Sequence, residues 1–165
     1  MPFSIVAALT HNNVISKNNK LPWDIPEDLE YFYHLVNTKI IVMGHKTYES
    51  LNGPLKNSKN IVLSRDYSLK LPQCLVMHSI TEVLIQYQNS FEEIMVIGGG
   101  LIYKEFLPYV NKMYLTLIEQ DVDGDIYFPE WKKNEWLIIN KRTAKSNLYS
   151  YSFLILERKN NKVFL

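Results

Sequence analysis

Five short, strongly apolar runs, separated by segments with helical periodicity, constrain the fold of this 165-residue chain more than any other feature. The runs are FSIVAAL, KIIVMG, NIVLS, CLVM and IMVIG, at residues 3–9, 39–44, 60–64, 74–77 and 94–98. Continuous apolar runs of this length are typical of strands that are buried on both faces, as in a parallel sheet. Four of the runs precede helix-like segments, at 26–36, 45–51, 80–88 and 101–107. This alternation predicts an α/β domain.

The pattern changes after Pro108. Residues 112–120, 136–142 and 149–158 have strand-like sequences with no helix between them, so we expect antiparallel strands added to a mainly parallel sheet. The prediction is one α/β domain over residues 1–159, with a central mixed, mostly parallel sheet of about eight strands and about four helices on its two faces. Residues 160–165 form a C-terminal tail to which we assign no role.

Composition argues against several classes of protein. The 18 basic and 17 acidic residues nearly cancel, which gives no reason to expect a nucleic-acid partner. No apolar run reaches the length of about 18 residues that a membrane span needs, and the N-terminus is unlike a signal peptide. Cys74 is the single cysteine, which excludes an internal disulfide and fits a reducing compartment. We expect a cytoplasmic protein and, by default, a monomer.

The stretch LPWDIPEDLEYF, residues 21–32, contains two adjacent acids that point in different directions. At about 100° per residue, Asp28 lies on the apolar side of the predicted helix and Glu27 lies on the opposite side. Acids favour the first turn of a helix because the helix dipole stabilises them, which explains an acid here but not an inward one. An inward carboxylate needs a compensating partner or loses its charge. A polar ligand is one such partner.

Three turns after predicted parallel strands carry residues suited to binding phosphate. They hold glycines, cations and hydroxyls: Gly44, His45, Lys46 and Thr47; Ser64 and Arg65; and Gly98, Gly99 and Gly100. The first two turns alone are consistent with ordinary connections, whereas the three adjacent glycines alone favour a ligand role, although they do not form the G-x-G-x-x-G fingerprint. Ligands of open α/β sheets bind at the carboxyl ends of the strands. Several such turns along one edge therefore predict an extended dinucleotide.

A metal site is not predicted. The segment DVDGDIYF, residues 121–128, resembles the start of an EF-hand loop, but its glycine comes at the fourth position instead of the sixth. The four histidines show no metal-ligand spacing with Cys74.

The chain resembles dihydrofolate reductase over roughly residues 3–159. The matching stretches include IVAAL, LPWDIPEDLEYF, IVMGHKTYESL, PLKNSKNIVLSR, EIMVIGGGLIYKEFLP and FLILER, in the order and spacing of the family. The resemblance implies an NADPH-dependent oxidoreductase that reduces 7,8-dihydrofolate to 5,6,7,8-tetrahydrofolate, by hydride transfer to C6 with protonation at N5. Such an enzyme supports one-carbon and thymidylate metabolism. Its implied partners are the small-molecule substrate and antifolate inhibitors, with no nucleic acid and no membrane.

The resemblance also implies which residues form the site. Asp28 matches the acid that binds the pterin and promotes protonation through water, and Trp23 and Thr116 match residues that orient the water and the carboxylate. Residues 10–25 match the loop that closes over the nicotinamide, with Leu21 covering the ring. The implied substrate pocket consists of Val6, Ala7, Ala8, Asp28, Leu29, Phe32, Leu51, Leu55, Ile97, Tyr103 and Thr116. The implied cofactor site consists of Ala8, Ile15, Ser16, Asn19, Lys20, Leu21, Gly44, His45, Lys46, Thr47, Leu63, Ser64, Arg65, Ile97, Gly98, Gly99, Gly100, Leu101, Ile102 and Tyr103. Lys46 and Arg65 are the cations that favour NADPH over NADH.

The chain departs from the family at Ser58. The family usually has an arginine there, which forms a bidentate pair with the α-carboxylate of the substrate's glutamate tail, and serine cannot form that pair. Lys56 and Lys59 are close in sequence, and Tyr33 replaces a residue that is often basic. We therefore expect weakened tail binding, with a tail-free dihydropterin or dihydropteroate as the alternative substrate. Two further alternatives are a related reductase acting on a pyrimidine or another pterin, and a non-catalytic dinucleotide-binding module.

Overall fold

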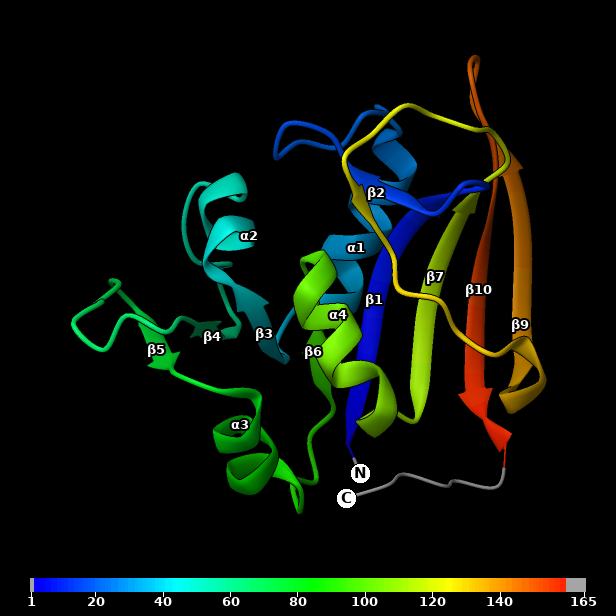
Figure 1. Ribbon diagram of the computed structural model, residues 1–165. Coiled ribbons are helices and arrows are strands. Elements are labelled where there is room, and N and C mark those ends of the chain that lie inside the picture. Colours follow the sequence, from blue (N-terminus) through cyan, green and yellow to red (C-terminus); the bar gives the residue numbers. More distant parts are fainter. Residues whose placement is uncertain (1, 160–165) are drawn as a thin grey trace.

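The computed structural model describes residues 2–159 and places eight strands of this range in one sheet (Figure 1). The strand order is β5-β4-β3-β6-β1-β7-β10-β9. The strands are β1 (Phe3–Thr10), β3 (Ile40–Gly44), β4 (Lys59–Leu63), β5 (Cys74–Met77), β6 (Ile94–Val96), β7 (Lys112–Ile118), β9 (Trp136–Lys145) and β10 (Ser150–Arg158). The predicted mixed α/β sheet is confirmed, and the tail at 160–165 lies outside the described residues.

The sheet contains one more parallel strand than we expected. The five apolar runs form β1 and β3 to β6, and each pairs in parallel with its neighbours among these strands. We expected antiparallel strands after residue 108, but β7 is parallel to β1. The reason is that α4 forms a crossover between β6 and β7. It returns the chain to the end of the sheet at which the parallel strands begin, so β7 runs in the same direction as β1. β10 is antiparallel to both of its neighbours, β7 and β9.

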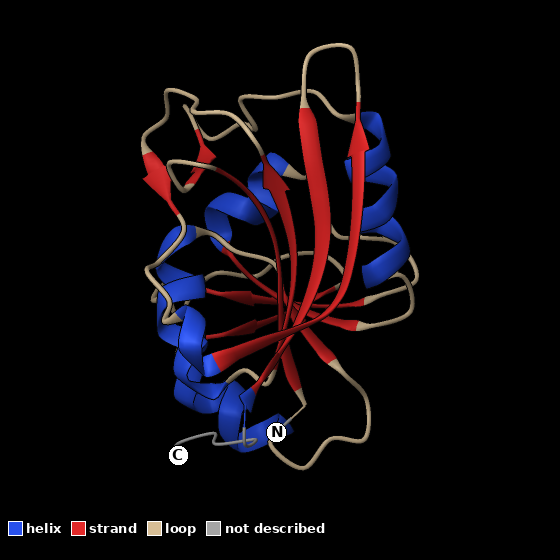
Figure 2. Ribbon diagram, turned by 90° about the vertical axis from the view of Figure 1, so that its right-hand side faces the viewer, coloured by secondary structure: helices blue, strands red, loops and turns tan. Residues whose placement is uncertain are grey.

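Helices cover both faces of the sheet (Figure 2). The α-helices of the described range are α1 (Pro26–Val36), α2 (His45–Ser50), α3 (Ile80–Tyr87) and α4 (Gly100–Phe106), and two short 3-10 turns are η1 (Leu107–Tyr109) and η2 (Lys133–Glu135). Side chains of β1 alternate between the faces. Phe3 and Ile5 pack with α3 and α4, whereas Val6 packs with Val36 of α1. None of the described helices is long and apolar enough to cross a membrane.

A second, two-stranded sheet was not predicted. It pairs β2 (Val14–Ser16) with β8 (Ile126–Tyr127) in antiparallel fashion. Strands of three and two residues are too short to produce a recognisable periodicity in the sequence. The pairing holds the segment after β1 beside the segment after β7, above the carboxyl ends of the central strands (Figure 1).

Candidate active site

Asp28 points into the protein from the first turn of α1. Its side chain is buried, with 8% of the residue exposed, and Oδ1 accepts a 2.6 Å hydrogen bond from the hydroxyl of Thr116. Thr116 lies on β7, opposite Ala8 of β1 in the register. The inward direction predicted from helical periodicity is confirmed, and the contact joins a helix to the centre of the sheet.

The surroundings of Asp28 favour its protonated form. Burial raises the pKa of Asp28, the hydrogen bond from Thr116 opposes that rise, and the carboxylate of Glu27 adds to it. Glu27 itself points outward, where Oε1 accepts a 3.3 Å hydrogen bond from Arg142. A carboxyl group with a raised pKa holds its proton at a higher pH than an exposed aspartate does, and it can then supply that proton to a bound base.

Trp23 lies in a small cluster next to the start of α1. Its side chain is buried and packs with Ile25, Ile118, Tyr151 and Phe153. Its indole Nε1 has no hydrogen-bond acceptor within residues 2–159. A buried N–H group usually has a partner, so this donor is consistent with the implied role of Trp23 in orienting a water or a polar group of a ligand.

Partly buried side chains form an apolar wall along α1, beginning at Phe32, which lies one turn after Asp28 on the same side of the helix. The wall consists of Phe32, Leu35, Leu51 and Leu55, packed against buried Val6, Val36 and Ile97. Leu29, on the same helix, is 46% exposed. The side chain of Ala7 does not join this wall, because it faces the opposite side of the sheet, whereas Ala8 packs with the cluster around Trp23.

Two glycine turns meet at the carboxyl edge of the sheet. The backbone N–H of Gly44, after β3, donates a 2.8 Å hydrogen bond to the carbonyl of Gly98, after β6. Gly98 has a φ of +117°, and a Cβ atom there would lie 3.0 Å from the hydroxyl oxygen of Tyr103. That hydroxyl is held in place, because its single hydrogen is shared between the carbonyl oxygens of Val6 and Ile97, at O–O distances of 2.7 and 2.8 Å. The turns therefore present bare backbone, which suits close approach of a pyrophosphate.

The polar residues of these turns lie around the same edge. A Cβ atom on Gly99 would lie 3.6 Å from the hydroxyl oxygen of Thr47. Lys46 and Arg65 are exposed, and His45 contacts Glu49, with 3.4 Å between Nε2 and Oε1. The hydroxyl of Thr47 therefore lies beside the bare backbone, and Lys46 and Arg65, which follow β3 and β4, are exposed on the segments that leave the same edge of the sheet. Cations and hydroxyls are groups that bind phosphate.

His78 lies in this region and was not predicted from the sequence. Its Nδ1 is 2.9 Å from the carbonyl oxygen of Ser64, and its ring stacks on that of Tyr67 with the centroids 4.1 Å apart. Of the four histidines, His45 was assigned to the cofactor site, whereas His78 was considered only as a possible metal ligand. β4 and β5 pair in parallel, with Leu63 opposite Met77, so the residues that follow them, Ser64 and His78, lie next to each other. This pairing of strands would have indicated that His78 lies at the predicted cofactor edge.

The remaining predicted cofactor residues differ in exposure. Ile15 and Leu63 are buried in the core cluster that Ile102 also contacts, whereas Leu101 is 57% exposed. Ser16 is half-buried, and Asn19, Lys20 and Leu21 are exposed on the loop between β2 and α1.

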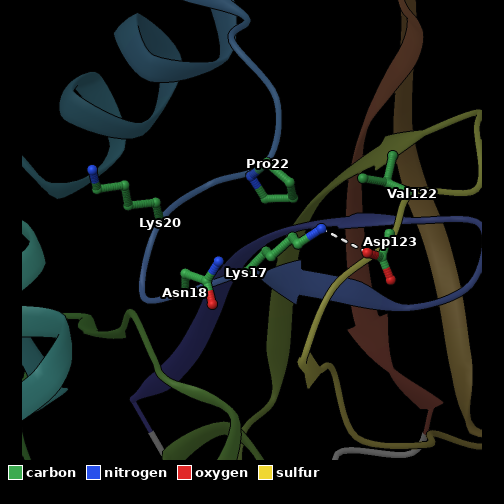
Figure 3. Close-up of a pocket in the computed structure, with 6 residues that line it drawn as sticks. All are labelled: Lys17, Asn18, Lys20, Pro22, Val122 and Asp123. Atoms are coloured by element: carbon green, nitrogen blue, oxygen red, sulfur yellow. Dashed lines mark hydrogen bonds and ion pairs between the residues drawn. The ribbon is translucent and has the colours of Figure 1, made fainter.

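That loop is fastened to residues 122–125. Figure 3 shows Lys17 directed at Asp123, with 2.6 Å between Nζ and Oδ2. The backbone N–H of Asn18 donates to Oδ2 of Asp125 at 3.0 Å, and the N–H of Asp125 donates to the carbonyl of Ser16 at 3.1 Å. The segment that resembled an EF-hand start therefore supplies anchoring contacts for the predicted closing loop. Nothing in the sequence indicated this pairing, because the partners are more than 100 residues apart.

The sequence profile of the family described as dihydrofolate reductase matches residues 2–158. The chain belongs to the dihydrofolate reductase family. It is 41% identical to a dihydrofolate reductase from Haemophilus influenzae and 44% identical to one from Buchnera aphidicola subsp. Acyrthosiphon pisum, covering 96% of this chain and 100% of each relative. A solved structure of dihydrofolate reductase from Enterococcus faecalis, complexed with NADP(H) and RAB-propyl, has a TM-score of 0.88 and 31% identity, covering 96% of each chain.

Ser58, where the resemblance implied a departure from an arginine of the family, has a hydroxyl that already forms a hydrogen bond. Ser58 donates a 2.8 Å hydrogen bond to the carbonyl of Val36, at the end of α1. Lys59, considered above as a substitute cation, lies with Nζ 5.3 Å from the ring centroid of Tyr87 on α3. Lys56 instead lines a pocket together with Ser58.

Proposed function

We infer that this chain reduces 7,8-dihydrofolate to 5,6,7,8-tetrahydrofolate with NADPH as the reductant. Membership of the dihydrofolate reductase family supports this reaction, and it supports dihydrofolate over the tail-free dihydropterin. The observation that carries the chemistry is the buried carboxyl group of Asp28, which accepts the hydrogen bond from Thr116. The relative from Enterococcus faecalis is described as a complex with NADP(H), which supports the same cofactor here.

We propose that Asp28 binds the pterin through its 2-amino group and the adjacent ring nitrogen. Because its pKa is raised by burial, the carboxyl group can promote protonation at N5 by way of a water. Thr116 would hold the carboxyl group in one orientation, and the indole N–H of Trp23, which has no acceptor among residues 2–159, would orient the water. The apolar wall that begins at Phe32 would contact the rest of the substrate.

The cofactor would lie along the carboxyl edge of the sheet. The backbone of Gly44 and of Gly98 to Gly100 would approach the pyrophosphate, and Lys46 and Arg65 would bind phosphate groups that include the adenosine 2′-phosphate. When bound, NADPH supplies the hydride that reaches C6. The loop that carries Leu21 would exclude water from the reacting atoms.

Loss of NADPH absorbance on addition of 7,8-dihydrofolate tests the proposal, with tetrahydrofolate identified by chromatography. We expect turnover that depends on dihydrofolate, with one NADPH consumed per tetrahydrofolate formed. NADH should support the reaction with a higher KM, because it lacks the 2′-phosphate that Arg65 would bind. Absence of turnover with both cofactors would contradict the proposed reaction.

We further propose that antifolate inhibitors bind beside Asp28, that the chain acts as a monomer and that it is located in the cytoplasm. The NADPH-dependent reaction and the unpaired Cys74 support a reducing compartment. Inhibitor protection of Asp28 from modification, light scattering and cell fractionation would test these three statements.

A further inference from the structure

The structure assigns recognition of the substrate's glutamate tail to Lys56, in a pocket at the C-terminal end of α1. We propose that the Lys56 ammonium binds a tail carboxylate as a single charge, where a bidentate guanidinium pair is missing. The inference rests on the proposed function, since it concerns how the same substrate, dihydrofolate, is held.

The pocket lies where the tail of dihydrofolate would reach. Val36 follows Asp28 by about 12 Å along the axis of α1, at about 1.5 Å per residue. The apolar wall of Phe32, Leu35, Leu51 and Leu55 fills the interval between them. A substrate with its pterin at Asp28 and its aminobenzoyl group along this wall therefore places its glutamate at the far end of the helix.

Lys56 is the cation of this pocket. The pocket has a volume of about 290 Å³ and is lined by Tyr33, Val36, Asn37, Pro54, Leu55, Lys56 and Ser58. Within residues 2–159, the ammonium of Lys56 forms no salt bridge, so its charge is available for a ligand. The remaining lining residues are neutral and offer an amide, a phenol, a hydroxyl and apolar surface.

Other nearby polar groups are engaged elsewhere. Ser58 donates its hydroxyl hydrogen to the carbonyl of Val36. Lys59 lies over the ring of Tyr87, which belongs to the core on the α3 side of the sheet and therefore on the opposite face from α1. Lys39 contacts Glu93, with 3.7 Å between Nζ and Oε1.

A carboxylate that binds at the C-terminal end of α1 needs a positively charged partner. Carbonyl groups at the C-terminus of a helix carry partial negative charge, which repels a carboxylate. Ser58 satisfies one of these carbonyls but adds no positive charge. Lys56 offers a mobile single charge without the planar fork of arginine, so the contact should be weaker and more sensitive to salt than a bidentate pair.

The test compares Lys56→Gln with Lys59→Gln, a matched variant that removes a lysine three positions away on the other face. KM is measured for 7,8-dihydrofolate and for 6-methyl-7,8-dihydropterin, which has no tail, at low and high NaCl concentration. Lys56→Gln should raise KM for dihydrofolate about two- to fivefold at low salt, as expected for a partly exposed ion pair. The ratio of that KM to the KM for the tail-free substrate should rise by the same factor, and Lys59→Gln should leave the ratio unchanged.

A second variant distinguishes loss of the positive charge from a structural disturbance caused by the substitution at position 56. Adding Ser58→Arg to the Lys56→Gln variant should lower KM for dihydrofolate to the wild-type value or below. An unchanged KM in Lys56→Gln, or an equal rise in Lys59→Gln, would overturn the assignment. Failure of the wild-type protein to reduce either substrate would overturn the proposed function instead, so the two failures are distinguishable.

Discussion

The hydroxyl of Thr116 donates a 2.6 Å hydrogen bond to Oδ1 of Asp28, across 88 residues of sequence. The contact brings β7 and α1 together at the one buried acid of α1. Burial raises the pKa of this acid, and the hydrogen bond from Thr116 limits the rise. The pair therefore sets both the orientation of the carboxyl group and the pH range over which it holds a proton.

Replacing Thr116 by valine should move the pH dependence of the reaction without abolishing it. Valine has nearly the same shape but cannot donate the hydrogen bond that favours the ionised form of Asp28. The pKa of Asp28 should rise further, so the decline in kcat/KM should begin at a higher pH than in the wild type. Thr116→Ser keeps the hydroxyl and is the control. A decline that moves to lower pH in Thr116→Val would contradict this relationship.

Asp28→Asn should stabilise the protein at neutral pH. The native state holds the Asp28 proton more tightly than the unfolded state, because the native pKa is raised. The stability of the wild type should therefore fall as pH increases from the usual aspartate pKa, about 3.9, through the native pKa. Asparagine does not ionise and avoids this loss. In thermal unfolding followed by circular dichroism, the gain in Tm over the wild type should grow with pH and then level off. A gain that shrinks with increasing pH would argue against a buried, titrating Asp28.

Helical periodicity was sufficient to predict the environment of Asp28, because α1 is a regular helix with one buried side. The direction of a side chain then follows from its position in the repeat. The strands β1, β3, β4 and β6 were equally readable, because each is largely buried on both faces and has a continuous apolar sequence. β5 was also predicted from its apolar sequence, although it lies at the edge of the sheet and is only partly buried.

The roles of Lys56 and Lys59 were not predictable in the same way. Lys59 is the first residue of β4 and its ammonium lies over Tyr87 of α3, whereas Lys56 lies in the preceding loop and lines the pocket at the end of α1. This separation depends on the order of strands and helices in space, which local sequence does not contain. The anchoring of Lys17 by Asp123 was missed for the same reason.

Gly98→Ala should destabilise the protein more than Gly53→Ala does. Both glycines have a positive φ, +117° and +122°, so alanine meets a similar backbone cost at each, of about 1–3 kcal/mol. A Cβ atom at Gly53 has nothing within 4 Å, whereas one at Gly98 would lie 3.0 Å from the hydroxyl oxygen of Tyr103. Urea unfolding gives the two free energies of unfolding. Gly98→Ala should also weaken NADPH binding, measured by fluorescence titration, and equal effects of the two substitutions would exclude the steric explanation.

Breaking the contact between Lys17 and Asp123 should loosen the loop that carries Leu21. Lys17→Met should raise KM for NADPH by about two- to threefold at low ionic strength, because the ion pair no longer holds the loop. Both side chains are exposed, so the difference from the wild type should disappear at high salt. Asp123→Asn should have the same effect, and combining the two changes should add little. Additive effects of the two substitutions would show that the residues act separately.

The pH dependence of kcat/KM in Asp28→Asn and Glu27→Gln tests the central claim most directly, because these neighbouring acids point in opposite directions. The wild-type rate should decline as pH rises through the raised pKa of Asp28. Asp28→Asn should be about 10²- to 10⁴-fold slower and should lose this decline. Glu27→Gln should keep the wild-type rate, with a small shift of the profile to lower pH, because the Glu27 carboxylate contributes to the raised pKa. A wild-type rate and profile in Asp28→Asn, or an equal loss in Glu27→Gln, would contradict the account.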